Sequence, residues 1–284
     1  MSTPSDNEDK TSDTPLTLQE FLVVSELLLV IVRSKHEVLM VDPLAAPDSL
    51  DAELGKHRTD MIAACLALLQ CGWQDGSLIN GLLDIVDSTC YDPNDEITNA
   101  AIRLLVALHH MLIQHDRTRL GILSDNLILG ELARRPESSR TFGECFVFLL
   151  NREGEPYPAN VYNIAIKFMC VELLWSILQS PPLSNYFYDN DRNVLVDILL
   201  QNIADLADDT DQVRALCLNT LGALICYTEY RQRPHKLSQV RRLLRELLNT
   251  GRVSSDFHLL ARKVLGDCTE ALAEASRHDA PSRA

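Results

Sequence analysis

The apolar positions of this chain recur at intervals of three and four residues, between short breaks that are polar or contain proline. One such set lies on a single helical stripe and comprises Ile97, Ala100, Ala101, Leu104, Leu108, Met111 and Leu112. This spacing is typical of amphipathic helices, whereas strands alternate apolar and polar residues. The pattern predicts helices over 18–34, 58–73, 77–89, 94–115, 125–134, 138–151, 159–179, 190–207, 211–228, 237–249 and 254–276.

The segment from Val161 to Leu178 differs from the others because apolar side chains cover most of its circumference. A helix that is apolar all round is buried, so we expect this one at the centre of the fold. Helices of this length joined by short loops suit a stack of helical hairpins. The sequence therefore predicts an all-α, armadillo- or HEAT-like helical-repeat solenoid of about ten to eleven helices, by element count and spacing, because no exact repeat is present.

The two ends of the chain have a different composition from the rest. Residues 1–15 are mostly polar or acidic and have too few large apolar side chains to offset the entropy of ordering. We therefore expect a disordered acidic tail there, followed by a capping box at Thr17 and Glu20 that starts the first helix. The prediction is one helical-repeat domain over 16–277 and a disordered C-terminus over 278–284.

The charge of the chain narrows the classes of partner. A net charge of −14 argues against general binding to nucleic acid or to an anionic membrane. The most apolar run near the start, Leu22–Val32, is too short to span a bilayer and follows an acidic segment, so we expect neither membrane insertion nor a signal peptide. One stretch, 231–252, is instead basic, with seven Arg or Lys against one Glu. It is either a solvated helix face or a contact surface for a partner.

The candidate chemistry of the sequence is sparse. The eight cysteines form no CxxC pair and mostly have apolar neighbours, which indicates buried free thiols in a reducing compartment, with no metal or cofactor. No nucleotide-binding or hydrolytic motif occurs. His109 and His110 are adjacent on a helix and point in different directions, so they are poorly placed to share a metal. We read the chain as a non-enzyme.

Three consecutive aromatic residues precede the helix expected at 190–207. Tyr186, Phe187 and Tyr188 are followed by Asp189-Asn190-Asp191. Either the aromatic side chains anchor the loop in the core while Asn190 or Asp191 caps the helix, or this segment contacts a partner. Asp197 lies among apolar residues and is either paired or outward-facing.

These residues also carry a resemblance to a known family. The run YFYDNDRNVLVDILL at 186–200, Arg214 within VRALCLNTLGALI, and Tyr227-Thr228-Glu229-Tyr230-Arg231 with the basic segment after it are similar to the leucine-rich domain of the WISH/DIP/SPIN family. The similarity is strongest over 145–250. The chain resembles the short fungal form, since it shows neither the SH3 domain nor the proline-rich segments of animal members.

The resemblance implies an armadillo-like fold and a specific activity. Members of the family bind the actin-related protein 2/3 complex and activate it without a pre-existing filament, so that linear actin filaments are seeded. By the same resemblance we expect a cytoplasmic protein at cortical actin patches that needs no cofactor, nucleic acid or small-molecule substrate.

Two sets of residues are the candidates for partner binding. The first is a basic stripe that comprises Arg231, Arg233, Lys236, Arg241, Arg242 and Arg245. The second set is Tyr188, Asn190 and Asp191. Two alternatives stay open: an adaptor of the same fold that binds another protein, and an enzyme assembled from distant residues, which predicts a deep polar pocket with strongly shifted pKa values.

Overall fold

The structure is a computed structural model that describes residues 76–91, 96–118, 126–136, 139–152, 161–205, 211–249 and 255–279. This part of the chain is all-helical, with nine α-helices and two 3₁₀ turns, η1 (Pro181–Leu183) and η3 (Glu229–Arg231). The α-helices are α3 (Ser77–Thr89), α4 (Glu96–Thr118), α5 (Leu127–Arg134), α6 (Ser139–Arg152), α7 (Val161–Gln179), α8 (Asp189–Asp205), α9 (Asp211–Tyr227), α10 (Leu237–Asn249) and α11 (Ser255–Asp279). The helices expected over 18–34 and 58–73, and the tail over 1–15, lie outside the described residues.

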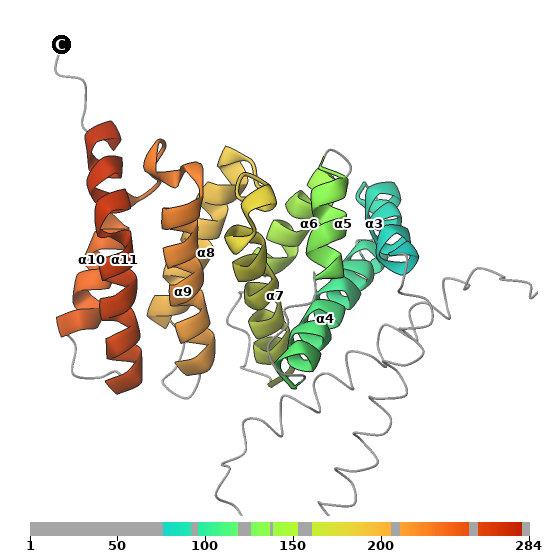
Figure 1. Cartoon of the computed structure of the whole chain (residues 1–284), viewed down its shortest axis with the longest axis horizontal. Helices are drawn as coiled ribbons and strands as arrows, with labels where there is room; N and C mark the ends of the chain where they lie inside the picture. Colours follow the sequence, from blue (N-terminus) through green and yellow to red (C-terminus); the bar gives the residue numbers. More distant parts are fainter. Residues whose placement is uncertain are drawn as a thin grey trace, which may run out of the picture.

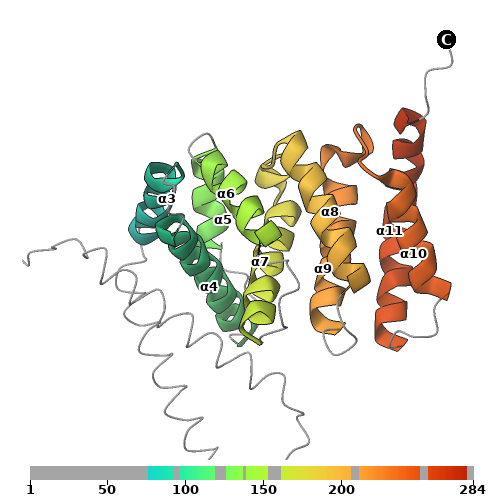
Figure 2. The same ribbon diagram turned by 180° about the vertical axis from the view of Figure 1, so that it is seen from behind.

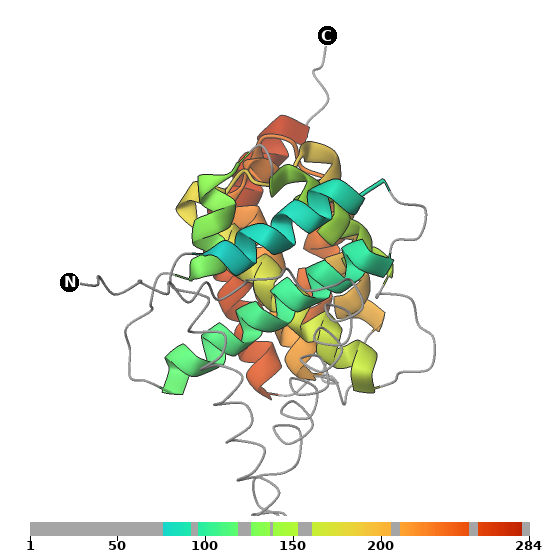
Figure 3. The same cartoon turned by 90° about the vertical axis from the view of Figure 1, so that its right-hand side faces the viewer.

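The helices pack in chain order as two neighbouring rows (Figure 1). One row consists of α4, α7, α9 and α11, each packed on the next. The other row consists of α3, α6, α8 and α10 and is seen from its own side in Figure 2. Along the stack, α3 and α4 lie nearest the viewer in Figure 3 and cover the helices behind them.

The core explains why these sequences form these helices. Most of α7 is buried, as its apolar circumference predicts, and its Cys170, Val171, Leu173 and Leu174 are fully enclosed. By contrast α10 is strongly amphipathic: Leu237, Val240, Leu244 and Leu247 are buried, while the residues between them face outward or sideways. Burying each such leucine contributes roughly 1.5–3 kcal/mol, so tertiary packing fixes these helices.

One helix of the described part is long and apolar enough to cross a membrane by length and composition. The window Glu96–Ile113 of α4 has a mean hydropathy of 1.2, and 67% of it is buried inside the protein. A core helix passes the same test, and the burial of α4 against α3 and α7 gives it that role.

Candidate partner interface

The aromatic loop before α8 is held by its first two residues. Tyr186 and Phe187 are buried, with their rings edge to face and their centroids 5.2 Å apart. The hydroxyl of Tyr186 donates to the backbone oxygen of Ser139 on α6, and burial raises the pKa of the Tyr186 phenol. These two aromatic side chains therefore anchor the loop in the core, which was one of the two readings of this segment.

Tyr188 points the other way. Its residue is 45% exposed, and the guanidinium of Arg140 on α6 lies 4.8 Å from the centre of its ring. Nη1 of Arg140 also donates to Oη of Tyr188 at 2.8 Å. The ring is thus presented at the surface in a fixed position, between α6 and the start of α8.

Asn190 and Asp191 lie in the first turn of α8. The helix begins at Asp189, and the backbone N–H of Arg192 already donates to the backbone oxygen of Tyr188 at 2.9 Å. The expectation that Asn190 or Asp191 caps this helix is therefore wrong, because both are inside it. Asn190 is exposed. Burial raises the pKa of the Asp191 carboxyl, and the like charge of Glu144 on α6 adds to the increase.

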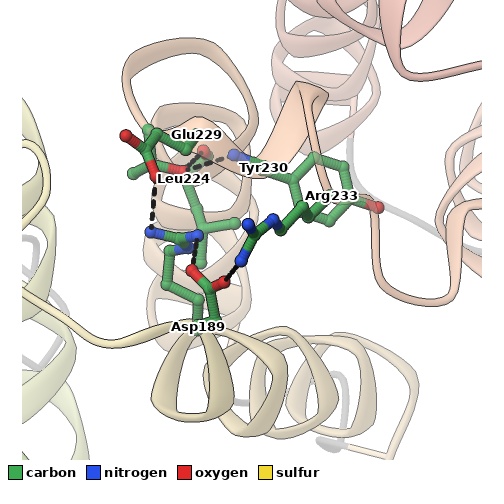
Figure 4. A network of polar contacts seen from close by, with 7 residues as sticks. Asp189, Leu224, Glu229, Tyr230 and Arg233 are labelled. Carbon is green, nitrogen blue, oxygen red and sulfur yellow. Dashed lines mark hydrogen bonds and ion pairs between the residues drawn. The ribbon is translucent and has the colours of Figure 1, made fainter. Parts of the chain in front are cut away.

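Asp189 is the centre of a charged junction between α8 and η3 (Figure 4). We define the junction as Asp189, Arg192, Glu229 and Arg233. The carboxylate of Asp189 pairs with the guanidinium groups of both Arg192 and Arg233. Nη1 of Arg192 lies 3.8 Å from Oε2 of Glu229. The junction joins the stretches at 186–200 and 227–231, which carry the family resemblance and are far apart in the sequence.

The connection from α9 to α10 is built around Tyr230. Thr228 accepts a hydrogen bond from the backbone N–H of Tyr230 at 3.2 Å and donates to the backbone oxygen of Leu224 at 2.6 Å. The ring of Tyr230 is buried, and its hydroxyl donates to the backbone oxygen of His235 at 2.8 Å. These contacts fix the turn that leads into α10, including Lys236 at a positive φ of 51°.

Asp197 on α8 faces this turn and is paired. Its Oδ1 lies 2.8 Å from Nε2 of His235, and its Oδ2 lies 2.9 Å from Nζ of Lys236. The sequence left open whether Asp197 is paired or faces outward, and the structure shows the ion pair. The charge of Lys236 is therefore already paired within the domain.

Members of the basic stripe contact different neighbouring helices and so do not form one continuous face. Arg231 lies 3.4 Å from Glu274 of α11, and Arg241 donates to the backbone oxygen of Leu272 at 2.8 Å and to the hydroxyl of Ser276. Those two arginines therefore bridge to α11, whereas Arg233 and Lys236 pair with carboxylates of α8.

Arg233, Lys236, Arg242 and Arg245 are all exposed, but Arg233 and Lys236 pair with α8, which leaves Arg242 and Arg245 as the exposed arginines of α10 itself. The side chain of Arg242 is 78% exposed and pairs only along its own helix, with Oε1 of Glu246 at 3.1 Å among the described residues. Arg245 is also exposed. An exposed pair of this kind contributes little to stability and is readily exchanged for a partner's carboxylate.

Arg242 also borders a groove between α8 and α10. The groove has a volume of about 590 Å³. Its apolar lining is Leu200, Ala204 and Leu243, and its polar lining is Asp197, Gln201, Lys236, Gln239, Arg242 and Glu246. Sequence reasoning missed the α8 side of this groove, because the apolar residues Leu200 and Ala204 carry no signal of contact with α10.

A second hollow of about 570 Å³ lies at the start of α8. Tyr188, Asn190 and Asp191 line it together with Glu144, Asp189 and Glu229. The structure thus brings the second candidate set together and adds three acids, Glu144, Asp189 and Glu229, that sequence reasoning did not select. The two hollows lie on the same α6–α8–α10 row, one at the start of α8 and one along its later turns.

The interior contains a polar cluster that sequence reasoning treated only as a poor metal site. Nδ1 of His110 lies 2.6 Å from Oε2 of Glu172 on α7, and both side chains are buried. Nδ1 of His109 accepts from the amide of Asn126 at 2.9 Å, and its Nε2 lies 3.0 Å from Oγ of Ser176. Burial lowers the pKa of His109 to about 4. The two imidazoles point to different partners, as adjacency on a helix predicts.

Two observations on the described residues bear on the enzyme alternative. No group of three or more potential metal ligands occurs among them. The groups with large pKa shifts include His109, Tyr186 and Cys217, and each is buried among core helices rather than in either hollow. Asp191, whose pKa burial raises, is the shifted group that does line a hollow, at the start of α8.

Comparison with known proteins shows a family match that contains the hollow at the start of α8 and the junction. Residues 94–240 match the family described as SPIN90/Ldb17, leucine-rich domain. Protein LDB17 of Eremothecium gossypii is 25% identical over 199 residues, which are 66% of this chain and 40% of that protein. Protein dip1 of Schizosaccharomyces pombe is 29% identical over 110 residues, or 39% of this chain and 27% of that protein.

A third relative, Protein LDB17 of Saccharomyces cerevisiae, is 25% identical over 170 residues, which are 57% of this chain and 31% of that protein. The matched regions span only 27–40% of the length of these relatives. The family match, in contrast, covers more than half of the chain and contains both α8 and the junction. This chain belongs to the SPIN90/Ldb17 leucine-rich domain family.

Proposed function

We propose that this domain binds the actin-related protein 2/3 complex and activates it without a preformed filament, so that it seeds linear actin filaments. The observation that carries the proposal is the family match over 94–240, which includes the aromatic loop, α8, the junction and the start of α10. Activity of this kind requires a rigid docking surface and no catalytic group on the domain.

The proposed contact surface runs along α8 and α10. Arg242 and Arg245 provide exposed positive charge, and Leu200 and Leu243 provide apolar contact within the groove. A helix or loop that presents carboxylates beside an apolar side chain fits this combination, because charge complementarity orients a partner while the desolvated apolar centre holds it. Tyr188 and Asn190 extend the same row toward α6 as a second contact.

The proposed mechanism is a population shift in the partner. We infer that the stacked helices act as an armadillo-like solenoid, rigid enough to hold one face against the complex while its two actin-like subunits take a filament-like arrangement. To move an equilibrium from 1:99 to 99:1, the domain must bind the active arrangement about 10⁴-fold more tightly than the inactive one. Any nucleotide belongs to the actin-related subunits. The corresponding location is the cytoplasm, at cortical actin patches.

The proposal is tested by following pyrene-actin assembly with purified complex and this chain, but without preformed filaments or another activator, and by imaging the products. A shortened lag with linear filaments supports the proposal. An unchanged lag, with protein shown to be folded by circular dichroism, contradicts direct activation. If the domain still binds the complex in that case, it is an adaptor of the same fold.

A further inference from the structure

The helices α9 and α11 approach each other closely at a glycine. Gly222 lies on α9, and a Cβ atom built on it would lie only 2.9 Å from Cγ1 of Val264 on α11. The same position is 3.8 Å from Sγ of Cys268. A side chain at Gly222 would therefore push α11 outward, and its absence brings Cys268 against α9.

This close approach places two thiols in contact. Sγ of Cys226 on α9 lies 3.3 Å from Sγ of Cys268 on α11, and both cysteines are free. A disulfide needs a sulfur–sulfur distance of about 2.0 Å, so a shift of roughly 1 Å would join them. Cys226 is half-buried and Cys268 is buried, which leaves one sulfur of the pair accessible to a small reagent.

We propose that Cys226 and Cys268 form an oxidation site, at which a hydroperoxide converts the two thiols into a disulfide that links α9 to α11. The inference is independent of the proposed function. It goes beyond the expectation of buried free thiols, because these two sulfurs come from separate helices and lie in contact.

The environment of the pair assigns a role to each sulfur. The hydrogen bond from Cys268 lowers the pKa of the Cys226 thiol and the positive charge of Arg231 adds to this, although burial and Asp267 act in the opposite direction. The same hydrogen bond and burial raise the pKa of the Cys268 thiol. Cys226 is therefore the nucleophile and Cys268 the resolving thiol.

The reaction proceeds in two balanced steps. The Cys226 thiolate attacks one peroxide oxygen, the O–O bond breaks, and hydroxide leaves, which gives a sulfenic acid on Cys226. The Cys268 sulfur then attacks the Cys226 sulfur, and the sulfenic oxygen leaves as water with the Cys268 proton. Two thiols and one hydrogen peroxide thus become one disulfide and two waters.

The disulfide would close a large loop that contains α10. The two cysteines are 42 positions apart, and α10 lies between them. Closing a loop of this size removes entropy from the unfolded chain, so we expect oxidation to raise the melting temperature by about 5–10 °C. The link would also fix α11 beside Arg231, which contacts the backbone oxygen of Cys226 at 3.5 Å and Glu274 at 3.4 Å.

The test oxidises the full chain with hydrogen peroxide and identifies linked peptides by mass spectrometry. We expect a Cys226–Cys268 link in the native protein and in the control Cys90→Ser, which removes a half-buried thiol that donates to the backbone oxygen of Asp87. Cys226→Ser should abolish the link. Cys268→Ser should leave a sulfenic acid on Cys226 that dimedone traps. Links formed mainly by other cysteines, or no link at all, would overturn the proposal.

Two glycine variants keep both thiols and test their proximity. Gly222→Ala should slow formation of the disulfide at least about tenfold, since small displacements of reacting atoms cost orders of magnitude in rate. Gly266→Ala is the matched control, because a Cβ on this α11 glycine meets nothing within 4 Å. Equal rates for both variants would contradict the role of the close approach. Neither readout involves actin assembly, so this test and that of the proposed function fail separately.

Discussion

Two polar clusters of this domain lie in opposite surroundings. The buried cluster between α4 and α7 consists of His109, His110, Asn126, Glu172 and Ser176. The charged junction at the start of α8 is open to solvent on one side, since the side chains of Asp189 and Glu229 are 41% and 47% exposed. In the first cluster His109, His110 and Glu172 are buried and their partners Asn126 and Ser176 are partly buried, whereas the carboxylates of the second cluster can exchange partners.

The difference follows from desolvation. A polar group enclosed in the core must keep its partner, because an unpaired buried donor or charge costs several kcal/mol. An exposed ion pair is worth about 0–1 kcal/mol, so its charges remain available to another protein at little cost. The buried cluster therefore stabilises the fold, and the α8–α10 surface, whose charges are exposed, is the better candidate for binding a partner.

The largest effect is expected from breaking the buried pair. Glu172→Ala removes the carboxylate that lies 2.6 Å from His110 and leaves that imidazole buried without it. We expect a loss of about 3–5 kcal/mol in the free energy of unfolding, measured by urea denaturation. Glu270→Ala, at an exposed position of α11, should change it by less than about 0.5 kcal/mol. Similar small losses for both variants would contradict the comparison.

Acid should act on the same cluster through His109. Its folded-state pKa of about 4 lies below the ordinary value of 6.5, so between these pH values the unfolded chain binds a proton that the folded one does not. Stability should thus fall by up to about 3 kcal/mol as pH drops from 6.5 to 4, with no contribution from this group above that range. His109→Gln should flatten this slope in pH-dependent unfolding; an unchanged slope would contradict the assignment.

The junction allows a comparison of two arginines that share one carboxylate. The side chain of Arg192 is 6% exposed and that of Arg233 is 77% exposed, and both pair with Asp189. We expect Arg192→Met to lower the free energy of unfolding by about 1–2 kcal/mol and Arg233→Met by less than about 0.5 kcal/mol. Thermal unfolding of the two variants measures both losses. Equal losses would show that burial does not determine how much each arginine contributes to stability.

The smallest effect on stability is expected on α10. Arg242→Glu with Arg245→Glu reverses two exposed charges, of which Arg242 pairs along its own helix with Glu246. The free energy of unfolding should change by less than about 0.5 kcal/mol in urea denaturation. A loss of several kcal/mol in the free energy of unfolding would show that these side chains stabilise the fold.

Much of the fold could be predicted from the sequence, because helix periodicity is a local property. All nine helices expected after residue 76 are present, and the largest differences are at the ends of α4 and α11, which were expected at 115 and 276 and lie at Thr118 and Asp279. The C-terminal segment expected to be disordered, 278–284, therefore begins inside α11, and its last residues lie outside the described part.

The candidate site was less predictable, because its geometry depends on which helices become neighbours. Arg241 and Arg242 are adjacent in the sequence, but Arg241 donates a hydrogen bond to α11, whereas Arg242 lines the groove. Asp197 pairs with His235 and Lys236, although the whole of α9 separates them in the sequence. Charge clustering predicted the basic segment, and tertiary packing decided which of its side chains remain exposed.

The most direct test compares two double charge reversals in actin assembly. Arg242→Glu with Arg245→Glu alters the proposed contact surface, and Arg262→Glu with Lys263→Glu makes the same change in charge at exposed positions of α11. With purified actin-related protein 2/3 complex and no preformed filaments, we predict that the first variant loses most of the shortening of the lag and the second retains it. Equal activity of the two folded variants would contradict the assignment of the contact surface to α10.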